Sequence, residues 1–176
     1  FFSLGNVDFK KIVKWSELYF GTIPVKRKTE GREVPQECQP IYRTIKKRVS
    51  QSHTMMGAYA YGLHSDKRLP LYLLNNVLGG PGMNSKFNLA LRERAGLVYS
   101  VESSLTSYSD CGLLSIYYGS DEKNRDYCQE LIFKELKKLR EKAFTTLQLS
   151  RYVKQLMGQL AIGQENKESL VLSLAK

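Results

Sequence analysis

Apolar positions along the chain change their period several times, and each change marks the boundary of a predicted element. Over residues 9–20 apolar side chains recur near helical spacing, directly after Asp8, which can cap a helix. Residues 1–4 are apolar and are followed by a Gly-Asn turn signal, a pattern typical of the end of a strand. Because this strand would be entered midway, we interpret the chain as a fragment of a longer protein.

The next part of the chain predicts a surface loop and then strands. Residues 26–40 are polar and carry two prolines, which favours a loop. Residues 42–49 alternate loosely between apolar and basic side chains, and residues 53–62 are rich in Met, Ala and Tyr. Together they predict one long or bent strand, or two strands in succession. Since the second part shows little polarity on either face, we expect it to lie deep in a sheet.

A glycine-rich turn separates two predicted helices. The first carries an apolar stripe over residues 71–78, with Pro70 in its first turn and the Ser-Asp pair at 65–66 as its possible cap. It ends at the Gly-Gly-Pro-Gly run of residues 79–82. The second helix starts at Asn84 or Ser85 and is broken by Gly96.

The remaining pattern predicts a hairpin followed by long helices. Alternation over residues 97–105 and 113–118, with turn residues between them, is typical of two antiparallel strands. Two helices follow, and the second opens with Thr145 and Gln148, which are spaced as a capping box. The tail after Gly163 is helical in composition. This order predicts an α+β fold, with an antiparallel-dominated sheet and helices packed on one face.

Composition and charge narrow the function classes only slightly. The chain has 176 residues, which indicates one domain, or two small ones at most. Its net charge of +10 comes from basic residues that are spread along the chain, so solvated faces and loops account for most of them. An acidic partner surface or a nucleic acid are the alternatives. Three cysteines without C-x-x-C spacing argue against a disulfide framework and a cysteine zinc site.

The densest group of candidate functional residues is LRERAGLVYS, residues 91–100, in which Arg92 and Tyr99 are seven positions apart. Together with the preceding LGGPGMNSKFNLA, this stretch resembles the signature of the second half-domain of pitrilysin-type zinc peptidases. That group includes insulin-degrading enzyme and the mitochondrial processing peptidase. Pro81 stands where the family usually has glycine. The resemblance extends more loosely over residues 1–160, and it implies that residues 1–176 are one half-domain of a longer peptidase with two such halves.

The resemblance implies a catalytic role for Arg92 and Tyr99. In active members of the family, an arginine and a tyrosine with this spacing reach the substrate in the zinc site of the partner half. A guanidinium and a phenol can hydrogen-bond the substrate backbone or the oxyanion that develops during attack. The bare spacing also fits an arginine paired with Glu93 or another surface carboxylate, and a tyrosine that fills the core. Arg94 is a competing arginine, but it lies only five positions before Tyr99.

The zinc motif of the family is missing from this sequence. Active members bind zinc through H-x-x-E-H on a helix, in which the glutamate activates water. Here His53 is followed by methionine and glycine at the last two positions of the motif, and His64 by lysine and arginine. We therefore predict that this chain holds no metal and no other cofactor, and that zinc binds to the other half-domain of the parent enzyme.

Three hypotheses follow for the function. The first is a non-zinc half that clasps an unfolded peptide against a catalytic half, located either in the same parent chain or in a partner subunit. The second is a non-catalytic scaffold of the same fold. The third, a nucleic-acid binder, predicts binding that weakens steeply with added salt. Because it depends only on the basic charge, we expect no nucleic-acid partner. No membrane span is expected, because no apolar run approaches roughly 20 residues. Under the first hypothesis, the fragment alone should be inactive as a peptidase.

Overall fold

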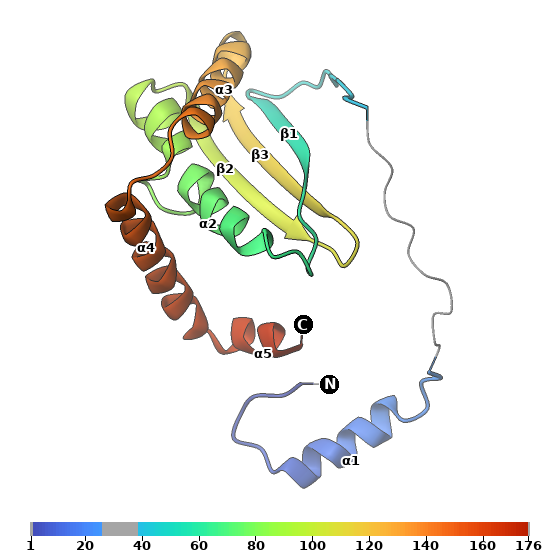
Figure 1. Cartoon of the computed structure of the whole chain (residues 1–176). Helices are drawn as coiled ribbons and strands as arrows, with labels where there is room; N and C mark the ends of the chain where they lie inside the picture. The colour runs from blue at the N-terminus through green and yellow to red at the C-terminus, as the bar shows by residue number, and fades with distance from the viewer. Residues whose placement is uncertain (1, 26–38, 176) are drawn as a thin grey trace. The chain divides into compact units, whose positions relative to one another are not determined.

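The computed structural model in Figure 1 describes residues 2–25 and 39–175. The chain divides into two compact units, one formed by residues 1–31 and 154–176 and the other by residues 32–153. Most of the predicted loop at residues 26–40 lies outside the described residues. The second unit contains the whole sheet and both candidate catalytic residues, so the site can be described within this unit alone.

Helices and strands succeed one another largely in the predicted order. The elements are α1 (Phe9–Phe20), β1 (Ser52–Ala60), α2 (Arg68–Gly79), the π-helix η1 (Asn88–Arg94), β2 (Val98–Ser107), β3 (Gly112–Ser120), the 3-10 turn η2 (Glu122–Asn124), α3 (Arg125–Glu141), α4 (Thr146–Gln164) and α5 (Lys167–Ala175).

Two of the predicted helix caps are present. The backbone N–H of Lys10 donates to Asp8 Oδ1 over 2.7 Å at the start of α1. At the start of α4, the Thr145 N–H donates to Gln148 Oε1 over 3.0 Å, and the Gln148 N–H donates to Thr145 Oγ1 over 3.3 Å. This reciprocal pair satisfies two amides that the helix leaves without partners.

The sheet is antiparallel, with the strand order β1-β3-β2. Strands β2 and β3 form the predicted hairpin, and α2 and α3 lie on one face of the sheet (Figure 1). This arrangement confirms the predicted α+β class, an antiparallel sheet with helices on one face. The core fills the space between sheet and helices, and its fully buried members include Leu78, Phe87, Leu91, Tyr118 and Ile132.

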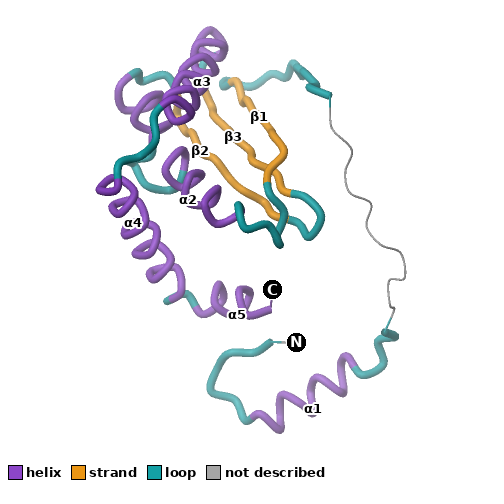
Figure 2. Tube along the Cα trace, viewed as in Figure 1, coloured by secondary structure: helices purple, strands orange, loops and turns teal. Residues whose placement is uncertain are grey.

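Three strand predictions were wrong. Residues 2–4 and 42–49 form no strand, and Figure 2 shows the chain between residues 39 and 51 as a loop that leads into β1. A strand needs a neighbouring ladder to satisfy its backbone groups, and sequence alternation cannot supply that neighbour. Strand β1 is not deep in the sheet either. In the described part of the chain it pairs only with β3, and Met55 remains 71% exposed on the face opposite the helices.

A close contact between the end of α2 and β2 fixes the helical layer on the sheet. Asn75 Nδ2 donates to the Ser103 carbonyl oxygen over 3.2 Å, and Ser103 Oγ donates back to the Asn75 carbonyl oxygen over 3.1 Å. One turn later, a Cβ on Gly79 would lie 2.6 Å from the Ser103 nitrogen and 3.0 Å from a ring carbon of Phe87. Gly79 is therefore needed because the helix end and the strand backbone approach too closely for a side chain.

We expect Gly79→Ala to lower the free energy of unfolding by about 1–3 kcal/mol, because the new methyl group would overlap the backbone of β2. The measurement is chemical denaturation followed by circular dichroism. Gly57→Ala is the matched control, since a Cβ there would meet one side-chain atom of Leu113 at an ordinary 3.8 Å. A Gly79→Ala variant as stable as Gly57→Ala would contradict this account of the helix–strand contact.

Candidate functional site

Arg92 projects from a short helix whose inner side is anchored in the core. The chain becomes helical at Lys86 and continues as the π-helix η1. The sequence predicted an ordinary helix here, and the wider π turn was not foreseen. Phe87 and Leu91 are fully buried, whereas Arg92 is exposed. π turns are rare and are found frequently at functional sites, and this one contains Arg92 in its last turn.

Gly96 ends this helix and turns the chain into β2. Its φ of 61° lies in the left-handed region, which glycine adopts without steric cost. The Gly96 N–H donates to the Arg92 carbonyl oxygen over 3.0 Å, and the Leu97 N–H donates to the Leu91 carbonyl oxygen over 2.9 Å. These bonds satisfy two of the last carbonyls of the helix. The turn therefore sets how the helix end that carries Arg92 meets the strand that carries Tyr99.

Tyr99 occupies a bulge at the start of β2. Val98 pairs with Ser120 of β3, but the next paired residue of β2 is Ser100, opposite Gly119. Tyr99 is thus an extra residue in the ladder, and such a bulge re-aims the side chain that it carries. The Tyr99 side chain is 58% exposed, so it does not fill the core.

The Tyr99 hydroxyl is bonded to a carboxylate on the neighbouring strand end. Tyr99 Oη donates to Asp121 Oδ1 over 3.2 Å. This hydrogen bond, together with the negative charge of Asp121, raises the pKa of Tyr99 above its usual value. The phenol is therefore held in its protonated form over a wider pH range.

Asp121 was missed by reasoning from the sequence, because it belongs to no motif. The hairpin register could have found it, since antiparallel pairing brings the residue after β3 next to the beginning of β2. The sequence also favours a different role, because aspartate is a preferred helix cap and η2 begins directly after Asp121. In the structure its side chain makes no capping hydrogen bond.

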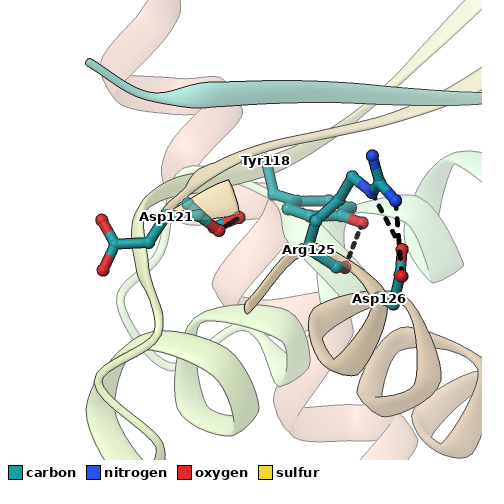
Figure 3. A network of polar contacts seen from close by, with 5 residues as sticks. Tyr118, Asp121, Arg125 and Asp126 are labelled. Carbon is teal, nitrogen blue, oxygen red and sulfur yellow. Dashed lines mark hydrogen bonds and ion pairs between the residues drawn. The ribbon is translucent and has the colours of Figure 1, made fainter. Parts of the chain in front are cut away.

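The backbone on both sides of Asp121 is anchored by other contacts (Figure 3). The buried Tyr118 donates its hydroxyl to the Arg125 carbonyl oxygen over 2.9 Å, which ties β3 to the start of α3. Arg125 Nε forms an ion pair with Asp126 Oδ1 at 2.8 Å and lowers the pKa of that carboxyl. The Asp121 carboxylate points away from this group in Figure 3. It is thus presented from a fixed backbone toward Tyr99.

Arg92 does not show the pairing that the alternative interpretation required. Within the described part of the chain, neither Glu93 nor another carboxylate forms an ion pair with the Arg92 guanidinium. Arg92 and Tyr99 are thus two exposed side chains that flank the Gly96 turn. Arg94 is also exposed and lies at the end of the same helix.

The histidines are not arranged as metal ligands. His53 Nδ1 lies 2.7 Å from the Tyr117 hydroxyl oxygen on the neighbouring strand, and the two rings stack. His64 lies in the turn between β1 and α2. Across residues 2–25 and 39–175, no group of three or more His, Cys, Asp or Glu side chains could hold a metal ion. No helix in the same ranges is long and apolar enough to cross a membrane.

A protein-family model described as the peptidase M16 inactive domain matches residues 1–156. The chain belongs to the peptidase M16 family, as its inactive domain. This membership confirms the resemblance to zinc peptidases that the Arg92 and Tyr99 stretch indicated.

Two named relatives agree with this membership. An uncharacterized zinc protease of Bacillus subtilis, YmxG, is 33% identical over 94% of the chain and 40% of its own length. An uncharacterized zinc protease of Streptomyces coelicolor is 28% identical over 98% of the chain and 39% of its own length. The chain therefore spans about 40% of the length of each of these two relatives.

The fold is shared with solved structures at lower identity. A protease from Helicobacter pylori has a TM-score of 0.71 at 16% identity, over 95% of this chain and 42% of that chain. The peptidase M16 inactive domain from Pseudomonas fluorescens has a TM-score of 0.59 at 22% identity, over 62% and 27%. A chain of Complex III2 from Candida albicans has a TM-score of 0.62 at 17% identity, over 74% and 33%.

We expect the purified chain to retain only substoichiometric zinc after dialysis, and to show no peptidase activity of its own. Catalytic zinc sites use three protein ligands, and neither histidine has two further ligands positioned around it in the described structure. The measurement is metal analysis of the dialysed protein. One zinc ion per chain that is lost in His53→Ala or His64→Ala would contradict this prediction.

Proposed function

We propose that this chain is the substrate-clasping, non-zinc half of a zinc metalloendopeptidase that degrades or processes peptides. It would act together with a catalytic half-domain, either elsewhere in a longer chain or in a partner subunit. The observation that carries the proposal is the pair of exposed side chains, Arg92 and Tyr99, on the two sides of the Gly96 turn. Neither side chain packs in the core.

The two residues suit the recognition of an extended peptide backbone. The guanidinium of Arg92 offers several N–H donors in a fixed plane, which can bond a peptide carbonyl and the oxyanion that forms from it. The phenol of Tyr99 can bond another backbone group of the same peptide. The catalytic half would supply zinc, which activates water and polarises the scissile carbonyl. This chain would contribute orientation and charge stabilisation from outside the metal's own ligands.

Rigid support makes these contacts effective. Arg92 follows the buried Leu91 directly, and Tyr99 lies on a strand that pairs with the centre of the sheet. Packed elements hold the backbone at both positions, so the chain needs little rearrangement to present the two exposed side chains to a ligand.

A scaffold of the same fold is the second candidate. The observation that favours it is the similarity in fold to a chain of Complex III2 from Candida albicans. In that case Arg92 and Tyr99 would have no substrate to bind. The two candidates differ in what the exposed pair does when the chain is assembled with a zinc-bearing half-domain.

In the assembled enzyme we expect Arg92→Ala to lower kcat/KM for an unstructured peptide by roughly 10²–10³, the scale of losing one oxyanion donor. Tyr99→Phe should lower it by at least about 10-fold, because a backbone group of the peptide loses its partner. Zinc content and melting temperature should not change, since both side chains are exposed.

Arg94→Ala is the matched control for these variants. It removes an arginine from the same exposed helix end, and we expect cleavage within about 2-fold of the wild type. Loss of activity in Arg94→Ala but not in Arg92→Ala would mean that Arg94, and not Arg92, is the arginine that contacts the substrate. Normal cleavage by all three variants would favour the scaffold.

A further inference from the structure

The bond between Tyr99 and Asp121 constrains what the phenol can offer to a peptide. A phenol has a single O–H to donate, and Tyr99 donates it to Asp121 Oδ1 over 3.2 Å. The lone pairs on Tyr99 Oη remain available to accept a hydrogen bond. In this geometry Tyr99 is a hydrogen-bond acceptor for anything that approaches from solvent.

The charge of Asp121 points to the same conclusion. A carboxylate beside Tyr99 Oη repels a negatively charged oxygen brought close to that atom and attracts the positive end of an N–H dipole. An oxyanion would therefore be stabilised poorly at Tyr99. The guanidinium of Arg92 would stabilise it better, since no carboxylate in the described part of the chain forms an ion pair with it. The two exposed side chains thus differ in polarity, with a donor on one side of the Gly96 turn and an acceptor on the other.

Other roles for the Asp121 side chain are not supported by the contacts. Its carboxylate makes no capping hydrogen bond at the start of η2, although Asp121 occupies the N-cap position. It also points away from the Arg125 and Asp126 ion pair (Figure 3). The backbone around it is fixed instead by the bond from Tyr118 to the Arg125 carbonyl oxygen and by the pairing of Ser120 with Val98. The carboxylate is therefore carried by a rigid strand end and bonds Tyr99.

We infer that Asp121 is a positioning residue, which holds the Tyr99 hydroxyl so that its oxygen accepts a hydrogen bond from a backbone N–H of the bound peptide. The inference rests on the proposed function and specifies one of its substrate contacts. A peptide backbone presents alternating N–H and C=O groups, so an acceptor at Tyr99 and a donor at Arg92 would together select an extended peptide in one direction.

The first test is direct and needs no activity. The pKa of Tyr99 can be followed by NMR titration of the chain with [13Cζ]tyrosine, and the Tyr99 signal is assigned by its loss in Tyr99→Phe. Asp121→Ala should lower this pKa, because the carboxylate that stabilises the protonated phenol is removed. Glu122→Gln is the matched control, since it removes one charge from the adjacent residue and should shift the pKa less. An unchanged pKa in Asp121→Ala would overturn the inference.

The second test uses the chain assembled with its zinc-bearing half. Asp121→Ala should raise KM for an unstructured peptide on the order of 3- to 10-fold with little change in kcat, as expected for contacts made equally in the ground and transition states. Asp121→Asn, which keeps an acceptor oxygen, should recover part of this loss. In a Tyr99→Phe background, Asp121→Ala should have no further effect, because the group that it positions is already gone.

The outcomes separate this inference from the proposed function. If Tyr99→Phe impairs cleavage but Asp121→Ala does not, Asp121 does not position the phenol, and the clasping role stands. If Asp121→Ala lowers kcat instead of raising KM, Tyr99 acts on the oxyanion and the assignment as an acceptor is overturned. If neither variant affects cleavage while the pKa shift is present, the bond exists but both the inference and the catalytic role of Tyr99 fail.

Discussion

The close approach of α2 to β2 is the contact on which the geometry of the site depends. Two reciprocal hydrogen bonds between Asn75 and Ser103 hold the helix against the strand, and Gly79 lets their backbones meet one turn later. With that helix end fixed, the following segment places Phe87 and Leu91 in the core. Arg92 then faces solvent because its neighbour Leu91 is held inside.

Three local irregularities convert this regular layer into a candidate site. The π turn changes the directions in which side chains project from the helix. The left-handed Gly96 turns the chain sharply, and the bulge changes the direction of the Tyr99 side chain. The π turn contains Arg92, the bulge is at Tyr99, and Gly96 lies between these two proposed substrate contacts. Asp121 adds an electrostatic element from the opposite strand, so the two exposed groups differ in hydrogen-bonding polarity as well as in position.

The sequence was sufficient for features that depend on local chemistry. The cap at Asp8, the capping box at Thr145 and Gln148, and the β2–β3 hairpin all follow from short-range patterns. Strand pairing could not be predicted in the same way, because a strand's burial depends on neighbours distant in sequence. For that reason β1, with its apolar composition, was expected in the sheet interior and has an exposed face.

The site shows the same division between local and non-local information. Arg92 and Tyr99 could be selected because they share a motif with the glycine turn, whereas Asp121 lies 22 positions after Tyr99 and meets it only through strand pairing. The π turn could not be predicted either, since its residue pattern is typical of an ordinary helix. Motifs thus identified the groups, and the tertiary structure decided how each hydroxyl and charge is oriented.

A structure of the assembled enzyme with a bound peptide, trapped by removing the zinc, would test the central claim most directly. The account predicts that Arg92 donates to a backbone carbonyl and that Tyr99 Oη accepts from a backbone N–H, each at about 2.7–3.2 Å. A peptide that is held in the zinc site while both side chains remain in solvent would contradict it.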